Sequence, residues 1–449
     1  MVPANPVPTS RIIIMPIVRR LSSLSLIGCL MSAAFAADLP WPEKNGPTAD
    51  GHVPAAEAAG LPTVWDEAAG KNIAWKIPLE GEGHSTPVIG DGKLWFTAAT
   101  EDGKRQFVYV VDGETGKVLH HKLLFENPEP EPLGNAVNSY ASPSCVLEPE
   151  AVYVHFGEYG TARLNRATAE VEWQRRDLKC RHYRGPGSSP VVFENLLILT
   201  FDGISKQYVV ALDKTDGHTV WEAPRTHDYH DLNEEGKPRG DGDYRKAFGT
   251  PSLATVDGRP QLISIASRAA YGLDPRTGKT IWLLEHENYN AAARPLVMPG
   301  FAVLNMGSER AHLFGLKLDA STQGTVTESH VAWQRKKGNS SLSSPMLVGG
   351  RVYSMTNQGV LYCVDAKTGE EVYAERIGGS FVSSPIVVGD LMYFSDEAGV
   401  TTVVRAGAEF QEVAKNTLDE GMRSSAAVAD GALYLHTFKH LYKIAGARR

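Results

Sequence analysis

The chain has 449 residues, of which 42 % are hydrophobic and 22 % are charged. These values are typical of a globular protein with a large core, and they exclude a disordered chain. The net charge of −7 argues against nucleic acid as a partner, because phosphate recognition needs a basic surface.

The first segment in chain order is a predicted export signal over residues 1–36. Arg19 and Arg20 precede an apolar run that ends in Ala34-Phe35-Ala36, the A-x-A pattern of a cleavage site. The run is too short to span a membrane comfortably. We therefore expect export to the periplasm or the extracellular space. A lipid-anchored form is the alternative, because the four residues that end at Cys29 resemble a bacterial lipobox.

Residues 37–70 precede the first repeat and are predicted to be an N-terminal extension, followed by a single domain over residues 71–446. The segment 72–79 reads as an outer strand that carries Trp75 but has no earlier strands of its own. The last repeat, residues 424–446, is one strand short of four. Pairing these two segments would close a ring and leave no free sheet edge.

A dipeptide of Ser or Thr followed by Pro recurs before a β-rich run. It occurs at Thr86-Pro87, Ser142-Pro143, Ser189-Pro190, Thr250-Pro251, Ser344-Pro345 and Ser384-Pro385. Arg294-Pro295 and Ser425-Ala426 occupy the same slot with changes. Successive copies are 40 to 61 residues apart, a period that is typical of four-stranded propeller blades with insertions.

A second pattern, Asp-x-x-Thr-Gly, is followed by a large residue eight positions after the Asp. Asp112 leads in this way to His120, and Asp274 leads to Trp282. The Asp can accept backbone hydrogen bonds and the Gly can adopt the positive φ of a tight hairpin turn. We expect the large residue to cover the edge between two blades. The tryptophans assigned to this structural role are Trp75, Trp173, Trp221, Trp282 and Trp333.

These patterns predict an all-β, eight-bladed β-propeller whose ring is closed by an N-terminal strand; seven blades is the alternative if the divergent Arg294 repeat is miscounted. The patterns resemble the pyrroloquinoline-quinone-like (PQQ-like) repeat. That family includes quinoprotein alcohol dehydrogenases and the outer-membrane assembly lipoproteins of the Bam complex, and the size and blade number look closer to the second group. The chain also looks like uncharacterised exported propellers of planctomycete-type bacteria.

The resemblance does not by itself imply the quinone. Family dehydrogenases carry a disulfide between adjacent cysteines against the quinone, whereas Cys145, Cys180 and Cys363 are far apart here. No calcium-ligating Glu/Asn pair and no catalytic Asp can be assigned on matching motifs. We therefore expect no cofactor, and PQQ is disfavoured. The sequence leaves open whether Cys145 and Cys180 form a disulfide or are free thiols.

Ligands of propellers bind at the mouth of the central channel, where loops from every blade meet. Polar residues just before each Ser-Pro strand are the candidates for that mouth. They are His84, Asn138, Tyr140, His182, Arg184, Lys246, Arg294 and Arg423. Their cationic character suits an anionic or carbohydrate-like ligand, although a polar mouth is also the ordinary condition of a propeller.

The longest insertion, residues 225–246, is acidic and resembles the start of a calcium loop. Oxygen-bearing side chains alternate before Gly236, but Gly242 stands where a bidentate Glu is expected. The candidate calcium ligands are Asp231, Asn233, Glu235, Asp241 and Asp243. A solvated acidic loop is the alternative interpretation. Two histidines of the insertion could also ligate zinc or copper, but no third ligand is placed beside them.

Two functions remain open, and the sequence assigns no catalytic residue to either. The first is a non-catalytic binding or scaffold module for a protein or cell-envelope component, with carbohydrate as a further ligand class. The second is an enzyme that acts on a sugar or alcohol at the channel mouth. We expect the first, because no nucleophile elbow, phosphate-binding loop, dinucleotide fingerprint or zinc-protease motif is present.

Overall fold

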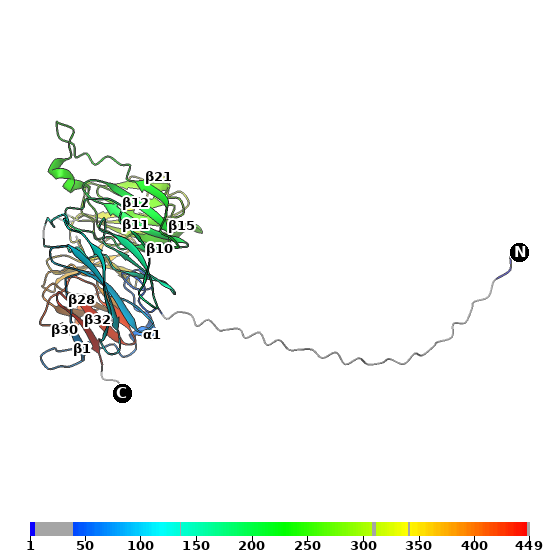
Figure 1. Cartoon of the computed structure of the whole chain (residues 1–449). Coiled ribbons are helices and arrows are strands. Elements are labelled where there is room, and N and C mark those ends of the chain that lie inside the picture. The colour runs from blue at the N-terminus through cyan, green and yellow to red at the C-terminus, as the bar shows by residue number, and fades with distance from the viewer. Residues whose placement is uncertain (5–38, 135, 308–310, 340–341, 447–449) are drawn as a thin grey trace. The chain divides into compact units, whose positions relative to one another are not determined.

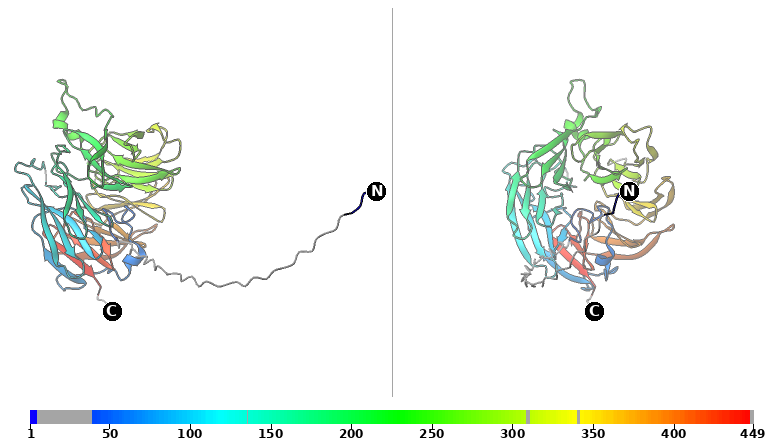
Figure 2. Two further views of the ribbon diagram at one scale, coloured as in Figure 1. Left: turned by 45° about the vertical axis from the view of Figure 1, so that its right-hand side comes forward. Right: turned by 90° about the vertical axis from the view of Figure 1, so that its right-hand side faces the viewer.

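The computed structural model describes residues 1–4, 39–134, 136–307, 311–339 and 342–446 (Figure 1). The predicted signal peptide, including Cys29, lies outside these residues apart from its first four. The described residues from 39 onward form one compact unit, in which the strands make eight sheets arranged in a ring (Figure 2). The prediction of an all-β, eight-bladed propeller is confirmed. The seven-blade alternative is wrong, because the segment after Arg294 forms a blade of its own.

Each sheet is one blade. The blades are numbered in chain order, and the strands of each blade are given from the innermost to the outermost. Blade 1 contains β2 (Val88–Gly90), β3 (Lys93–Ala99), β4 (Arg105–Asp112) and β5 (Val118–Glu126). Blade 2 contains β6 (Val146–Leu147), β7 (Ala151–His155), β8 (Thr161–Asn165) and β9 (Val171–Arg175). Blade 3 contains β10 (Val191–Phe193), β11 (Leu196–Asp202), β12 (Gln207–Asp213) and β13 (Thr219–Pro224). Blade 4 contains β14 (Ser252–Val256), β15 (Arg259–Ile265), β16 (Ala269–Leu273), β17 (Thr280–Glu285) and the added β21 (Gly324–Thr325).

The second half of the ring repeats this order. Blade 5 contains β18 (Leu296–Met298), β19 (Phe301–Met306), β20 (His312–Lys317) and β22 (Val331–Arg335). Blade 6 contains β23 (Met346–Val348), β24 (Arg351–Met355), β25 (Val360–Asp365) and β26 (Glu371–Arg376). Blade 7 contains β27 (Ile386–Val388), β28 (Leu391–Ser395), β29 (Val400–Arg405) and β30 (Gln411–Thr417). Blade 8 contains β31 (Ala427–Ala429), β32 (Ala432–His436), β33 (His440–Ala445) and β1 (Ile73–Pro78).

The N-terminal strand β1 closes the ring by antiparallel pairing with β33, the last strand of the chain, with Trp75 opposite Lys443. The predicted closure is therefore confirmed. Two short helices complete the described secondary structure, α1 (Ala55–Ala58) and the 3₁₀ helix η1 (Arg239–Arg245).

The core lies between the blades. The middle strands are apolar on both faces because a neighbouring blade covers each face; β11, for example, is buried along its whole length. Leu94 and Phe96 of blade 1 share one hydrophobic cluster with Leu433 and Tyr434 of blade 8. The outer strands are far more exposed, and β9 has no fully buried residue. Each blade is therefore stabilised mainly by the surfaces of its two neighbours.

The Asp-x-x-Thr-Gly turns have the geometry that the sequence predicts. Asp112 Oδ1 accepts hydrogen bonds from the backbone N–H of Thr115 at 2.8 Å and from its hydroxyl at 2.7 Å. Gly116 follows with φ of +73°, a conformation that costs other residues free energy. These turns join the third and fourth strands at one end of each blade, here called the turn face. The loops that enter the innermost strands lie at the opposite end, the loop face.

The recurring tryptophans pack against the turn of the next blade. The indole N–H of Trp173 donates to Lys214 O at 2.9 Å, and that of Trp221 donates to Pro275 O at 3.1 Å. Trp333 makes the equivalent bond to Ala366 O at 3.2 Å. Trp282 differs, because its N–H donates to Gln261 of its own blade at 2.8 Å. The next turn there is the longer one that carries β21, which pairs directly with β17.

A ring of hydroxyl groups links the innermost strands, and we call it the hydroxyl ring. The backbone N–H of one blade donates to the Ser or Thr hydroxyl of the next blade in six places: Thr86 to Ser144 (2.9 Å), Ser144 to Ser189 (3.0 Å), Ser189 to Thr250 (2.9 Å), Arg294 to Ser344 (3.0 Å), Ser344 to Ser384 (3.1 Å) and Ser384 to Ser425 (2.9 Å). The ring explains why Ser or Thr recurs before the strands.

In blade 2 the hydroxyl ring corrects the register expected from sequence. The residue that occupies the slot is Ser144, followed by Cys145, and not Ser142, followed by Pro143. The proline is therefore not the essential part of the pattern, whereas the hydroxyl is. Arg294 supplies no hydroxyl, so the ring is interrupted between blades 4 and 5, and its side chain is free for another contact.

The chain crosses the turn-face end of the channel before it enters the propeller. We call residues 41–53 the strap. At one end Trp41 is fully buried and exchanges backbone hydrogen bonds with Ile89 of β2. At the other end, Val53 N–H donates to Val387 O and Val387 N–H donates to Gly51 O, both at 2.8 Å. The strap thus connects the innermost strands of blades 1 and 7.

Candidate functional site

The channel opens at the loop face into a cavity of about 810 Å³. Loops or innermost strands of all eight blades contribute to its wall, and Lys44 of the strap also lines it. Four of the eight mouth residues predicted from sequence line this cavity, namely His84, Asn138, Arg184 and Arg423. The other four are not part of the described lining, and each of them contacts other parts of the protein.

Cationic side chains dominate the described lining of the cavity. They are Lys44, Arg184, Lys336, Lys337, Arg376 and Arg423. The described lining contains a single carboxylate, that of Asp243. The chain as a whole has more acidic than basic residues, 52 against 45. The mouth therefore has the opposite charge from the protein that carries it, which favours anions at this point of the surface.

His84 is held neutral at the edge of this cavity. Burial, followed by the positive charges of Arg423 and His436, lowers the pKa of His84 to about 3. Its ring lies edge-on to Phe438, with the ring centroids 6.4 Å apart. An imidazole in this state offers one hydrogen-bond donor and one acceptor but no charge near neutral pH.

Asn138 and Tyr140 organise the loop between blades 1 and 2. The side-chain amide of Asn138 donates to Arg184 O at 2.8 Å and to Pro186 O at 3.0 Å, and its carbonyl accepts from the hydroxyl of Ser142. Tyr140 is buried and its hydroxyl donates to Glu131 O at 2.9 Å. These contacts join two neighbouring loops of the mouth.

His182, Arg184 and Lys246 meet between blades 3 and 4. Burial and the charge of Lys246 lower the pKa of His182 to about 4. Arg184 Nη2 lies 3.4 Å from Asp243 Oδ1, and Lys246 Nζ contacts the same oxygen. The Nε of Arg184 is buried and has no hydrogen-bond partner among the described residues. Arg184, a residue of the cavity lining, thus retains one unused donor among the described residues.

Arg294 is turned to the strap instead of to the mouth. It is 3 % exposed. Its Nη1 donates to Lys44 O at 2.6 Å, and its Nη2 lies 3.0 Å from Glu43 Oε2. The residue that breaks the hydroxyl ring therefore fixes the segment that crosses the channel. Burial and the Arg294 guanidinium lower the pKa of Lys44 to about 8.

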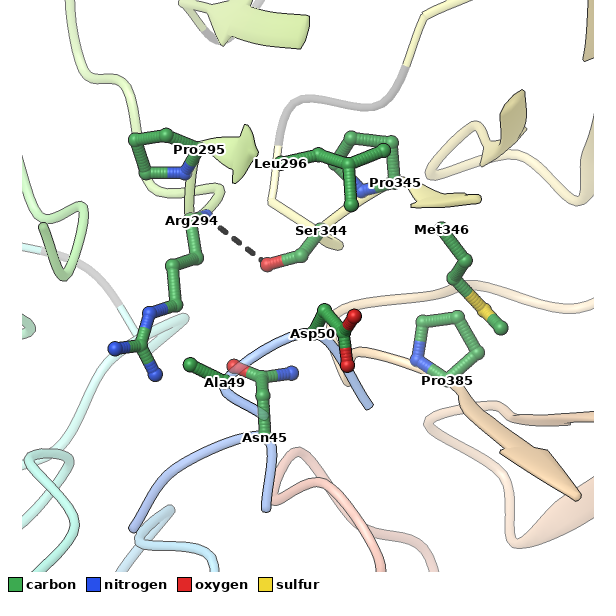
Figure 3. Close-up of a pocket in the computed structure, with 10 residues that line it drawn as sticks. All are labelled: Asn45, Ala49, Asp50, Arg294, Pro295, Leu296, Ser344, Pro345, Met346 and Pro385. Atoms are coloured by element: carbon green, nitrogen blue, oxygen red, sulfur yellow. Dashed lines mark hydrogen bonds between the residues drawn. The ribbon is translucent and has the colours of Figure 1, made fainter. Parts of the chain in front are cut away.

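The turn-face end of the channel is filled. Figure 3 shows Asn45, Ala49 and Asp50 of the strap directly below Arg294 and Ser344 of the hydroxyl ring. The space enclosed there is about 10 Å³, which is hardly enough for one water molecule. The strap thus occupies the channel beside Arg294 and Ser344, whereas the large cavity lies at the loop face.

The predicted calcium ligands form ion pairs with basic side chains or hydrogen bonds with the backbone of the loop. Asp231 accepts hydrogen bonds from Nε and Nη2 of Arg245, both at 2.8 Å. Asn233 Oδ1 accepts from the backbone N–H of Glu235 and Lys237, and the Glu235 carboxylate pairs with Lys237 at 3.0 Å.

Asp243 contacts Lys246, and the side chain of Asp241 lies outside what the structure describes. Among the described residues, the one group of three or more potential metal ligands consists of the half-buried Asp213 and the exposed Asp216 and His218. Calcium binding by the insertion stays a prediction.

The three cysteines of the propeller are free thiols in the structure. Cys145 and Cys180 belong to different hydrophobic clusters, and burial raises the pKa of Cys145 to about 12. They behave as small apolar core residues.

Sequence reasoning missed several cavity residues that lie outside the slot before each Ser-Pro strand. Lys336, Lys337 and Asn339 follow the outer strand β22, and Asn290 follows β17. A search of every loop that follows an outer strand would have found them. Lys44 could not be found in this way, because the strap has no counterpart in the repeat.

Comparison with known proteins agrees with the propeller fold. The sequence model of the family described as outer membrane protein assembly factor BamB matches residues 36–177, 133–234 and 266–437. No curated protein sequence matches the chain. None of the helices in the described residues is both long and apolar enough to cross a membrane.

Solved structures share the fold at low sequence identity. BamB from Moraxella catarrhalis has a TM-score of 0.57 and 12 % identity, over 83 % of this chain and 99 % of that chain. A europium-containing methanol dehydrogenase has a TM-score of 0.53 and 12 % identity, over 91 % and 98 %. The computationally designed protein Ika8 has a TM-score of 0.55 and 11 % identity, over 82 % and 98 %. At such identities the likeness concerns the fold alone.

Proposed function

This chain belongs to the family of the outer membrane protein assembly factor BamB, and from that membership we propose that it is an exported, envelope-associated module that binds a protein partner through its loop face. The observation that carries the proposal is the difference between the two channel ends. The strap closes the turn-face end, whereas the loop-face end is an open cavity whose wall comes from every blade.

The chemistry of the mouth supports binding more than catalysis. General acid–base groups work best when their pKa lies near the operating pH. The pKa values of His84 and His182 are lowered to about 3 and about 4, so both imidazoles are weak bases. The lining carboxylate of Asp243 contacts Lys246 and lies 3.4 Å from Arg184. Neither imidazole is thus well matched to proton transfer near neutral pH.

The likeness to a methanol dehydrogenase raises the question of a quinone, and the residues present do not fit one. Calcium sites in proteins are built largely around carboxylates, but the described lining has one carboxylate and otherwise the oxygens of neutral amides and hydroxyls. The three described cysteines are buried free thiols, and they lie far apart in the sequence. We propose that the protein functions without PQQ, and that a sugar- or alcohol-active enzyme is the less favoured alternative.

Site-specific cross-linking in intact envelopes tests the proposal. A photo-reactive residue in place of Lys337 at the loop-face cavity should give one adduct of defined mass with a protein partner. The same residue in place of Lys279, which is exposed on a turn of blade 4, should give none. Equal adducts from both positions, or none from Lys337, would contradict a loop-face binding module. Dye reduction with added quinone and calcium is expected to stay at background.

A further inference from the structure

The cavity at the loop face combines two kinds of unused binding capacity. The first is positive charge. Lys336 and Lys337 are exposed after β22, and Lys44 of the strap lines the same cavity. None of these three ammonium groups has a carboxylate partner among the described residues. Cations that converge without counter-charges repel one another and attract anions.

Lys44 is the most informative of these cations. Burial and the Arg294 guanidinium lower its pKa, so its charged form is destabilised in the free protein. The neighbouring Glu43 is already paired with Arg294, and therefore cannot neutralise Lys44 fully. A charge that is costly to bury is stabilised when an anion enters the cavity.

The second capacity is hydrogen bonding. The side-chain carbonyl oxygens of Asn290 and Asn339 line the cavity, are buried, and have no partner among the described residues. The orientation of Asn339 is fixed, because its Nδ2 donates to Ala311 O and to Arg335 O at 2.8 and 2.9 Å. Arg184 Nε is an unused donor in the same cavity. Buried polar groups of this kind normally have partners.

A peptide with acidic side chains matches both capacities. Its carboxylates complement the cations, its backbone N–H groups complement the two asparagine oxygens, and its backbone carbonyls complement Arg184 Nε. A simple anion such as phosphate at neutral pH supplies few donors. The cavity volume of about 810 Å³ admits the tip of a loop or a chain end, but no folded domain.

We propose that the loop-face cavity is a receptor for an acidic peptide segment of the protein partner, which reaches down the channel to the Lys44 ammonium at its floor. This inference rests on the proposed function, and it specifies which part of the partner is recognised. The open end admits the segment, and the strap stops it.

Direct binding of defined probes tests this inference with the whole exported chain. A fluorescent hexaglutamate peptide should bind, and its affinity should fall as salt is raised. The matched hexaglutamine peptide should bind at least about tenfold more weakly. Trigalacturonate and inorganic phosphate should compete poorly. Equal binding of the glutamine peptide, or stronger binding of trigalacturonate or phosphate, would overturn the inference.

Two variants locate the site. Lys44→Gln removes the floor cation but keeps the backbone carbonyl that Arg294 holds, and Lys336→Gln with Lys337→Gln removes two exposed cations. Each should weaken hexaglutamate binding by about tenfold without lowering the melting temperature. Lys279→Gln is the control and should change nothing. Unchanged affinity in both variants would refute the site.

The outcomes also separate this inference from the proposed function. A cross-linked partner at Lys337 whose yield does not depend on Lys44 would leave the binding module intact and refute the acidic segment. Tight hexaglutamate binding without any cross-linked partner would support the cavity chemistry and refute the protein-binding module.

Discussion

The two ends of the central channel are built from the same repeat, yet they differ in how their charged side chains are paired. At the turn face, the guanidinium of Arg294 is buried and matched by Glu43 and by a carbonyl of the strap. At the loop face, six cations and one carboxylate line the cavity in the described residues, and two of the six, Arg184 and Arg423, are paired with carboxylates of the chain. At one end the chain itself supplies the partners of the buried charge, whereas at the other end cations remain available to a ligand.

The difference arises at positions where the repeat departs from its own pattern. Where other blades place a hydroxyl in the ring, blade 5 places Arg294. The loops after β17 and β22 add Asn290, Lys336 and Lys337, which have no counterpart in the repeat pattern. A propeller thus keeps its fold through regular positions and acquires its individual surface through exceptions.

The largest effect is expected from breaking the closed end. Arg294→Ala should lower the free energy of unfolding by about 3 kcal/mol, because removing one partner of a buried ion pair leaves the other uncompensated. Urea unfolding followed by tryptophan fluorescence measures this change.

The matched control is Arg276→Ala, whose ion pair with Glu194 is half exposed on both sides. Its cost should stay below about 1 kcal/mol. Equal costs for the two variants would show that the strap does not depend on Arg294.

A smaller effect should distinguish the two ends by pH. The pKa of His84 at the loop face is lowered to about 3 by burial, so below about pH 6.5 the unfolded chain binds a proton that the folded chain does not. His84 therefore reduces stability as the pH falls, by about 2 kcal/mol at pH 5. His84→Gln should remove that part of the acid-induced loss in a denaturation series from pH 7.5 to pH 5.

His52 at the strap provides the opposite case. Its hydrogen bond to the Asp50 carboxylate raises the pKa of His52, so the contribution of His52 to stability is present in acid and is lost as the pH rises through the raised pKa. His52→Gln should therefore make the acid-induced loss steeper. If both variants changed the pH series in the same direction, the electrostatic contrast between the ends would be wrong.

The smallest effect concerns the hydroxyl ring between the two ends. Ser189→Ala leaves the N–H of Ser144 without its acceptor and should cost about 1 kcal/mol. Ser189→Thr keeps the hydroxyl, as Thr250 does naturally in blade 4, and should cost much less. Urea midpoints that are equal for the two variants would mean that the ring does not stabilise the inner strands.

Much of the fold could be predicted because short sequence patterns within each repeat determine its turns and strands. The Asp112 turn, the Trp173 and Trp221 contacts, and the closure of blade 8 by β1 all follow from short patterns. The register of blade 2 was missed because Cys145 replaces the proline that marks the slot elsewhere. The different packing of Trp282 was missed because it depends on β21, a pairing outside the repeat.

The site was harder to predict, since it depends on contacts between segments far apart in the chain. Four of the residues taken from the slot before each Ser-Pro strand, among them His84 and Arg423, line the cavity. It could not show that Arg294 turns to Glu43, because that contact spans 251 residues. The strap has no periodic pattern, and its position became visible only through its pairing with Ile89 and Val387.

The pairing of β1 with β33 has a consequence for the order of assembly. The first strand of the propeller can find its partner only after the last strand has been made, and the strap likewise waits for Val387 of blade 7. Until then, both borders of the unfinished ring present unpaired strand edges, which readily pair with other chains. Synthesis or transport that stalls near the C-terminus should therefore yield aggregating fragments, whereas stable, shorter propellers should be rare.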